Sequence, residues 1–593
     1  MAVKQLKGVE YLIVNMPCES VFTPEDFSDE QKQFGETTEL YAKNEIVPNL
    51  EEIDRQNFDL VIAGMRECGE LGLLMMDAPV AYGGLDLDKT SSMLVTEKMA
   101  VTGAFALAYG VHTGLGSLPL IYYGTHEQKE KYLGKLISGE WLSAYCLTEP
   151  GSGSDALGAQ SSALLSEDGS HYILNGTKQF ITNGGLASLF TIFAKIDKEH
   201  FTAFLVERDF EGLIVGPEEK KLGLKGSSTT PVILENCKVP AENLLGETGQ
   251  GHKIAFNCLN IGRLKLGAGV TGAAKVALET GIAYANQRVQ FKKKISSFGA
   301  IKEKIADLTA DVFVSESLVY RLAGLLDENL ATIPRNIDDY YVFYQKGIQE
   351  YAAECSIAKV FCSEVLDRTV DEILQIHGGY GYVSDYPAER YYRDARIHRI
   401  VEGTNEINRL LISGIILRKA VKGELLLQAE ARDAFESLTT PSIEELTEAV
   451  PFATEKTLIA NLKTLFLILA GIAVEKFMDK ISQEQEVLIA LADIAIQIFA
   501  LESAVLRAEK SLSRYSTRKH KLAEAAVKVF AFGASESAGS AARKAALYIE
   551  ESDTLSMLLS GVRRFSKFDA SGLLAAKRLL ADASCEEGTY MFC

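Results

Sequence analysis

The sequence predicts a mainly α-helical protein with a central β domain, because the spacing of apolar residues changes from helical to strand-like and back along the chain. Over about 24–142, apolar residues recur at spacings of three and four, which is typical of helices. Over 143–250, short runs rich in Ile, Leu, Phe, Thr and Tyr alternate with turns and predict antiparallel strands. Helical spacing returns over 251–423 and continues, richer in Ala and Leu, over 424–593. These ranges are the four predicted domains.

Size and charge narrow the class of protein. A chain of 593 residues is too long for one ordinary core, and its net charge of -19 opposes binding to nucleic acid. The longest strongly apolar run, Leu465 to Val474, is shorter than the roughly 20 residues that cross a bilayer, so we expect a buried helix there. The N-terminus lacks the pattern of a signal peptide, and we expect a cytoplasmic location.

Common metal and nucleotide motifs are missing from the sequence. The nine cysteines are scattered singly, without the Cys and His spacing of a zinc site, so no metal is expected. The glycines of Gly151 to Gly158 do not have the GxGxxG spacing, and neither a P-loop nor a GxSxG elbow is present. Rossmann, P-loop and α/β-hydrolase interpretations are therefore disfavoured.

Five polar or glycine-rich segments remain as candidates for a site, and each has an ordinary structural explanation when it is taken alone. The Gly- and Ser-rich segment 145–155 suits a surface loop, 180–185 a hairpin, and the basic 288–294 a solvated face. The glycines of 375–382 follow a predicted helix and could act as its C-cap. The fifth segment, 397–409, reads IHRIVEGTNEINR.

Glu402 is the notable residue of that fifth segment. The carboxylate follows Ile400 and Val401, which would raise its pKa by desolvation, and it precedes Gly403, where a flat substrate could approach. The ordinary alternative is a carboxylate near the amides of a helix start.

Taken together and in order, the segments resemble the acyl-CoA dehydrogenase family. The resemblance rests on AYCLTEPGSGSD, FITNGG, LGLKGSSTTPVILENCKVPAENLLG, RVQFKKKISSFGAIKEKIADL, LQIHGGYGY and IVEGTNEINR, and it covers about residues 24–423. The region after it is similar to the extra C-terminal helical domain of the very-long-chain branch. This implies the acyl-CoA dehydrogenase fold, with a helical N-terminal domain, a β-barrel-like middle domain and a four-helix bundle.

The resemblance also implies FAD as cofactor and a set of site residues. Glu402 matches the catalytic base, and Ser154, Arg263 and Gly403 are expected to contact the substrate. The positions expected to bind FAD are Tyr145, Leu147, Thr148, Gly153, Ser154, Phe180, Thr182, Arg288, Phe291, Gln375, Gly379, Thr404 and Glu406. Those from Arg288 to Gly379 match positions that reach across a dimer.

The sequence departs from the family pattern at three positions. Lys292 stands where a glycine is usual, Lys294 where a proline is usual, and Phe180 where a tryptophan is common. Some relatives carry the base on an earlier helix, but the matching residue here is Gly262, so Glu402 is the only candidate base at either place.

The implied function is the α,β-dehydrogenation of fatty acyl-CoA thioesters, the first step of β-oxidation, on medium- to long-chain or very-long-chain substrates. Glu402 would act as the base, and the hydride would pass to N5 of FAD. The implied partners are an acyl-CoA, an electron-transferring flavoprotein and a second copy of the chain; peripheral membrane association stays open. Gly110 and Gly114, four residues apart, would either leave a channel for a long acyl tail or let two helices pack closely. The alternatives are an acyl-CoA oxidase that uses oxygen, or an interaction or assembly protein on the same fold.

Overall fold

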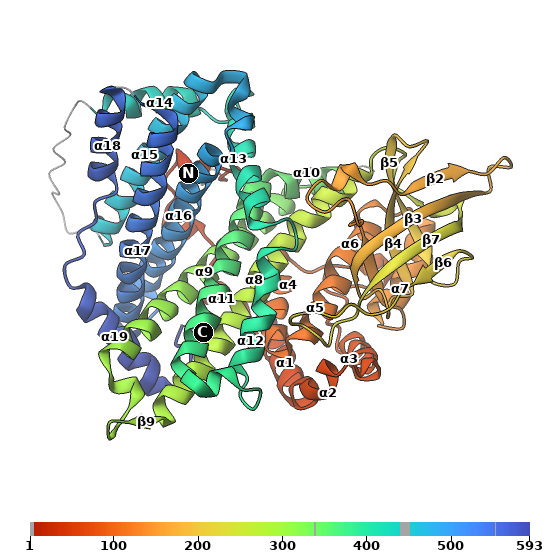
Figure 1. Ribbon diagram of the computed structural model, residues 1–593, viewed down its shortest axis with the longest axis horizontal. Coiled ribbons are helices and arrows are strands. Elements are labelled where there is room, and N and C mark those ends of the chain that lie inside the picture. The colour runs from red at the N-terminus through yellow and green to blue at the C-terminus, as the bar shows by residue number, and fades with distance from the viewer. Residues whose placement is uncertain (1–4, 337–339, 439–450, 552, 593) are drawn as a thin grey trace.

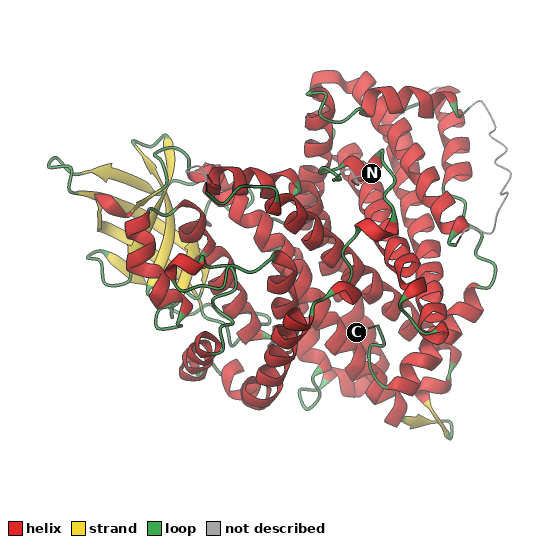
Figure 2. Cartoon of the chain, turned by 180° about the vertical axis from the view of Figure 1, so that it is seen from behind, coloured by secondary structure: helices red, strands yellow, loops and turns green. Residues whose placement is uncertain are grey.

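The computed structural model describes residues 5–336, 340–438, 451–551 and 553–592. A β domain lies at one end of the molecule, a group of long helices lies at the other, and a helical bundle lies between them (Figure 1). Figure 2 shows strands confined to the β domain and to one small hairpin on the far side of the bundle. The predicted class, mainly α with a central β domain, is confirmed.

The first helical region precedes the sheet and surrounds its own apolar core. Several of its helices have side-chain N-caps. Ser28 Oγ and Thr125 Oγ1 each accept a hydrogen bond from the backbone amide three residues later. Its α-helices are α1 (Asp29–Tyr41), α2 (Leu50–Asp54), α3 (Phe58–Glu70), α4 (Lys89–Met99), α5 (Ala104–Val111), α6 (Leu118–Tyr123) and α7 (His126–Ile137).

The β domain is one sheet in the order β6-β7-β3-β2-β4-β5-β8, with β1 paired to β4. Its strands are β1 (Ser143–Cys146), β2 (Ser162–Leu165), β3 (His171–Thr182), β4 (Leu189–Ile196), β5 (His200–Glu207), β6 (Leu213–Val215), β7 (Thr229–Pro240) and β8 (Leu244–Leu245). The predicted antiparallel pairing is confirmed for most strands, but it is wrong for β1 with β4 and for β2 with β4, which run parallel.

The bundle that follows is built on long helices whose apolar faces pack on one another. Its elements are α8 (Gly251–Gln287), the hairpin β9 (Val289–Gln290) and β10 (Lys293–Lys294), α9 (Gly299–Ala331), α10 (Tyr340–Glu350), α11 (Ala352–His377), α12 (Ala388–Ala395) and α13 (Asn405–Val421). At about 1.5 Å per residue, α8 alone is about 55 Å long and spans the whole bundle. One face of α8 is therefore available to line a long internal cavity.

The appended region packs against this bundle and shares its apolar core. Its helices are α14 (Leu427–Glu436), α15 (Ala453–Phe477), α16 (Gln485–Lys510), α17 (Thr517–Ile549), α18 (Asp553–Phe565) and α19 (Leu573–Glu587). Phe592, near the C-terminus, lies 4.6 Å from Phe313 of α9 between ring centroids. Because the core is continuous, the appended helices and the bundle form one packed body.

The N-terminal residues ahead of α1 join the bundle to the appended helices. The amide of Val9 donates to Glu354 of α11 at 2.5 Å, and Tyr11 Oη donates to the carbonyl of Ala495 on α16 at 3.2 Å. Lys463 of α15 donates to the carbonyl of Val14 at 3.0 Å. The sequence interpretation, which began the first domain at residue 24, missed this segment.

Three described stretches are long and apolar enough to cross a membrane by length and composition, namely 104–123, 453–483 and 485–513. The expectation that no apolar stretch reaches such a length is therefore wrong. Within their most apolar windows, 78%, 61% and 83% of the residues are buried inside the protein. Their apolar character is thus already used by the core, as predicted for Leu465 to Val474.

Candidate active site

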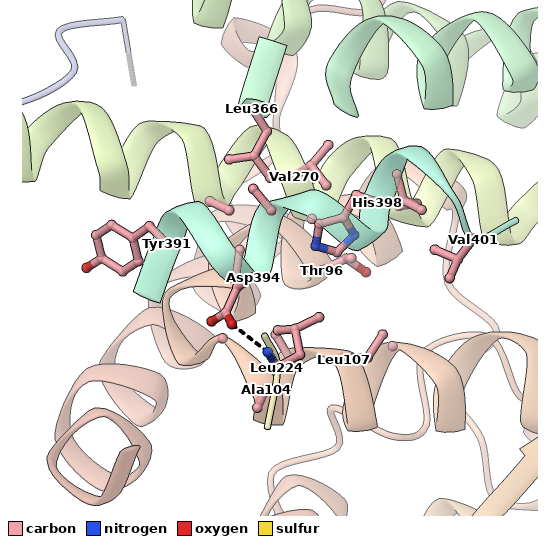
Figure 3. Close-up of a pocket in the computed structure, with 18 of the residues that line it drawn as sticks. Thr96, Ala104, Leu107, Leu224, Val270, Leu366, Tyr391, Asp394, His398 and Val401 are labelled. Carbon is pink, nitrogen blue, oxygen red and sulfur yellow. Dashed lines mark hydrogen bonds between the residues drawn. The ribbon is translucent and has the colours of Figure 1, made fainter. Parts of the chain in front are cut away.

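An apolar cavity lies between the bundle and the first helical region. One wall is the face of α8 that carries Gly262, Leu266, Gly269, Val270, Ala273 and Val276. Figure 3 shows the opposing sides: Ala104 and Leu107 of α5 with Leu224, and the segment from Tyr391 of α12 to Val401. Asp394 joins these sides, because its carboxylate accepts from the amide of Leu224 at 2.5 Å.

Glu402 lies at one end of the cavity and is its most distinctive polar group. Its backbone is left-handed, with φ of 57°, a conformation that residues other than glycine rarely adopt. Burial raises the pKa of its carboxyl to about 7, although Arg263 and Lys359 act in the opposite direction. Oε2 is buried and has no hydrogen-bond partner among the described residues. The predicted base is thus a desolvated carboxylate with one free oxygen.

Gly262 makes room for this carboxylate. A Cβ atom at Gly262 would lie 3.1 Å from Oε2 of Glu402 and 3.2 Å from Cδ2 of Leu115. The position at which some relatives carry a base is therefore directly beside the base predicted here. A side chain at residue 262 would displace the Glu402 carboxylate.

The turn after Glu402 leads into α13. Gly403 has φ of 82°, and Thr404 caps the helix by accepting from the amide of Ile407 at 3.3 Å. Glu406 is exposed on the first turn. Arg263 lies beneath the turn and donates from Nε to the carbonyl of Glu402 at 3.1 Å, so it contacts the backbone of the base and does not line the cavity.

A second group of predicted residues lies along the edge of the β domain. Tyr145 and Leu147 are buried, whereas Gly153 and Ser154 are exposed. The amide of Gln179 donates to the carbonyl of Thr148 at 2.9 Å, which brings the end of β1 beside β3. A β-bulge between Lys178 and Ile181 precedes Thr182 and presents Phe180, which is 62% exposed with φ of 58°.

The third group lines a separate groove that shares no residue with the cavity. Its lining includes Arg288, Phe291 and Gly379. Gln375 is exposed on the last turn of α11, about one turn before Gly379. Cβ atoms added at Gly378 or Gly379 would meet nothing within 4 Å. Phe291 is 88% exposed. Within one described chain, the structure does not bring this group together with Glu402.

The departures at Lys292 and Lys294 are accommodated by the β9–β10 hairpin beside this groove. Phe291 and Lys292 form its turn with φ of 50° and 65°, and Lys294 keeps φ of -59°, near the value that a proline would fix. We expect Lys292→Gly to stabilise the protein by about 0.5–1 kcal/mol, because glycine adopts positive φ without steric cost. Thermal unfolding of this variant and of the strand control Lys293→Gly checks this; a Lys292→Gly midpoint below that of the unmodified protein would contradict it.

The two glycines of the first helical region have different roles. Gly110 lines the cavity, and an added Cβ would meet nothing within 4 Å. Gly114 does not line it and lies at a kink, with φ of -98° and ψ of -106°. The kink at Gly114 interrupts the helix, so the spacing of four does not place the two glycines on one continuous helix face. The channel interpretation holds for Gly110 alone.

No cluster of three or more His, Cys, Asp or Glu side chains suited to a metal ion occurs in the described part of the chain.

The cavity offers an apolar wall, a carboxylate of raised pKa and a free backbone amide at Glu402, whose N–H has no acceptor among the described residues. A mostly apolar cavity with a few convergent polar groups and a carboxyl of raised pKa is typical of an enzyme active site.

Four protein-family models match consecutive parts of the chain. Those for the N-terminal, middle and C-terminal domains of acyl-CoA dehydrogenases match residues 28–140, 144–237 and 249–417, and a further acyl-CoA dehydrogenase C-terminal domain matches 461–564. The chain belongs to the acyl-CoA dehydrogenase family.

Individual relatives agree with this assignment. A probable acyl-CoA dehydrogenase of Bacillus subtilis is 45% identical over 98% of both chains. The very long-chain specific acyl-CoA dehydrogenase of rat mitochondria is 35% identical, over 81% of this chain and 73% of its own. The crystal structure of an acyl-CoA dehydrogenase of Bacillus anthracis complexed with FAD has a TM-score of 0.95 and 47% identity, covering 99% of this chain and all of that one.

Proposed function

We propose that this chain catalyses the FAD-dependent α,β-dehydrogenation of long-chain or very-long-chain fatty acyl-CoA thioesters, with Glu402 as the base. The observation that carries the proposal is the free, buried Oε2 of Glu402 at the end of a long apolar cavity. A pKa raised to about 7 suits a group that must accept a proton near neutral pH.

The residues around Glu402 supply what removal of the α proton requires. The α C–H of a thioester is a weak acid, so the developing enolate oxygen needs a hydrogen-bond donor. The free N–H of Glu402 can donate to it while Oε2 of the same residue takes the proton. The apolar wall excludes water and keeps the carboxylate poorly solvated, which favours proton uptake.

The edge of the β domain and the separate groove fit FAD. Phe180 offers an exposed aromatic face beside Thr182, a suitable surface for a planar ring system. Arg288 lies 5.3 Å above the Tyr380 ring and next to Gly378 and Gly379, where bare backbone and a guanidinium suit a diphosphate. FAD, when bound, supplies the acceptor for the hydrogen that leaves the β carbon.

A homodimer explains why the two parts of this cofactor site lie apart in one chain. The groove of Arg288 and Phe291 would complete the β-domain edge of a second copy, and the exposed Phe291 would be covered there. An electron-transferring flavoprotein is the proposed electron acceptor. The cytoplasmic location and a peripheral contact with the membrane stay predictions.

The length of the cavity supports a long acyl chain. The α8 wall from Gly262 to Val276 extends about 21 Å at about 1.5 Å per residue. An extended chain advances about 1.25 Å per carbon, so this wall covers roughly 16 carbons. The very-long-chain name of the rat relative points in the same direction.

We expect Gly110→Leu to shorten the preferred substrate. The new side chain would enter open space, so the fold should accept it while the cavity loses depth. The ratio of kcat/KM for palmitoyl-CoA to that for octanoyl-CoA should fall about tenfold or more, since single methylenes in a tight apolar pocket are worth about 1–3 kcal/mol. Steady-state kinetics with both substrates measure the ratio, and Gly134→Leu, at a glycine outside the cavity lining, is the control. An unchanged ratio would contradict the assignment of this cavity to the acyl tail.

Product analysis tests the reaction directly. FAD-loaded protein given palmitoyl-CoA and an artificial one-electron acceptor should yield a 2-enoyl-CoA lighter by two hydrogens, as seen by mass spectrometry. Recovery of palmitoyl-CoA alone would overturn the proposal. Stoichiometric peroxide in air would show the oxidase alternative instead.

A further inference from the structure

Lys359 is a buried lysine of α11 beside the Glu402 turn. Its ammonium donates to the carbonyl of Gly403 at 2.8 Å and to Oδ1 of Asn405 at 2.6 Å. No carboxylate lies within 4.0 Å of this ammonium in the described part of the chain. Burial disfavours the charged form of an unpaired lysine, so the ammonium of Lys359 depends on these two hydrogen bonds for stabilisation.

Both carbonyls of the turn are held by donors from other elements. Arg263 of α8 and Asn408 of α13 donate to the carbonyl of Glu402 at 3.1 and 3.2 Å. Lys359 and Asn408 donate to the carbonyl of Gly403 at 2.8 and 2.7 Å. These contacts offset the cost of the left-handed backbone at Glu402, which is about 1–2 kcal/mol for a residue with a Cβ atom.

Securing the carbonyls leaves the other groups of the turn available. The N–H of Glu402 has no acceptor, and Oε2 has no donor, among the residues that the structure describes. The turn therefore keeps both groups that the proposed chemistry needs, while its two carbonyls are bonded. Of the three donors to this turn, Lys359 alone contacts both Gly403 and the side chain of the first residue of α13.

We propose that Lys359 is a positioning residue, whose ammonium fixes the Glu402–Gly403 turn through Gly403 and Asn405 and whose positive charge favours the ionised form of Glu402. This inference rests on the proposed function of Glu402 as the base. Lys359 itself touches neither the cavity nor, on this account, the substrate.

The charged and titratable groups around the turn come from several elements, and they fit this role. Burial lowers the pKa of Lys359 to about 7, while an ionised Glu402 raises it, so each charge favours the other. His398 has its pKa lowered to about 4 by burial and by Lys359, so it is neutral at pH 7. The remaining groups that face the pair are Arg263 of α8, Glu364 of α11, Glu406 of α13 and Tyr145 of β1.

Two substitutions separate the hydrogen bonds from the charge. Lys359→Gln keeps a donor without the charge, and Lys359→Met removes both. Both should raise the pH at which Glu402 ionises by about one unit or more, the size of effect of one nearby opposite charge. The matched control is Lys419→Met, because Lys419 also donates to a backbone carbonyl, that of Gly8 at 3.1 Å, but lies outside the site.

Infrared spectroscopy gives a readout that does not need turnover. The carboxyl band that titrates in the FAD-loaded protein and is missing from Glu402→Gln reports Glu402. It should move to higher pH in both Lys359 variants and stay in place in Lys419→Met. An unmoved band in both Lys359 variants would overturn the inference, whether or not the protein dehydrogenates acyl-CoA.

Stopped-flow bleaching of the flavin by palmitoyl-CoA from pH 6 to 10 tests the positioning part. At pH 10, where Glu402 is ionised in every variant, Lys359→Gln should bleach at nearly the unmodified rate and Lys359→Met about tenfold more slowly. Equal rates for Met and unmodified protein at pH 10 would refute positioning. A failure of the unmodified protein to bleach, with the infrared shift present, would count against the proposed function instead.

Discussion

Glu402→Gln is expected to bind FAD and fold normally but to lose flavin reduction by acyl-CoA. Glutamine has nearly the same shape, so Gly262 still accommodates it, yet it cannot accept the α proton. A positioned base contributes about 10²–10⁴ in rate, and we expect the bleaching rate with palmitoyl-CoA to fall by at least that range. Anaerobic stopped-flow absorbance measures the loss.

The matched control is Glu424→Gln, an exposed glutamate beyond the end of α13. It should bleach as the unmodified protein does. Because Glu402 must be ionised to act, the unmodified rate should rise with pH through about 7. Rapid bleaching by Glu402→Gln would mean that another group removes the proton.

Arg507→Met is expected to cost about 3–5 kcal/mol of stability, because it removes the buried guanidinium that pairs with two carboxylates in this network. Arg507 of α16 is fully buried and donates to Glu316 of α9 at 2.5 Å and to Glu25, ahead of α1, at 2.7 Å. Its guanidinium also lies 4.6 Å from the centre of the Phe313 ring. Because the entropy of unfolding scales with chain length, the midpoint of thermal unfolding of this 593-residue chain should fall by about 2–4 °C.

Arg514→Met provides the contrast in the same region. Arg514 pairs with Asp26 at 2.5 Å, but its side chain is 40% exposed, so we expect a cost of no more than about 1 kcal/mol. Differential scanning calorimetry on both variants makes the comparison. Equal midpoints for the two variants would show that the buried network does not join the appended helices to the bundle.

Much of the fold could be predicted because local patterns and tertiary structure agree. The helical spacing of apolar residues in α8 and their alternation in β3 to β7 reflect which faces are buried, so this burial can be predicted from the sequence. The parallel pairing of β1 with β4 could not be predicted, since it depends on which distant strands meet. The N-terminal segment was missed for the same reason: its partners, Glu354 and Ala495, lie hundreds of residues away.

The residues of the candidate site also differ in whether the sequence alone could indicate their roles. Glu402 could be predicted because its segment occurs with the other segments in the order of the resembling family, although its local pattern alone also fits a helix-start carboxylate. Lys359 does not, because it is one lysine among many in a helix and gains its role only where α11 passes the Glu402 turn. Gly110 and Gly114 look equivalent until the kink at Gly114 separates them. A spacing of four implies a shared face only while the helix continues.

An anaerobic titration of the FAD-loaded protein with acyl-CoAs of 4 to 24 carbons tests the central claim most directly. We expect loss of the oxidised-flavin absorbance, complete at about one equivalent of substrate. The lowest concentration for half-maximal bleaching should occur with acyl chains of about 16 carbons or longer, as the length of the α8 wall implies. No bleaching with any chain length would contradict it.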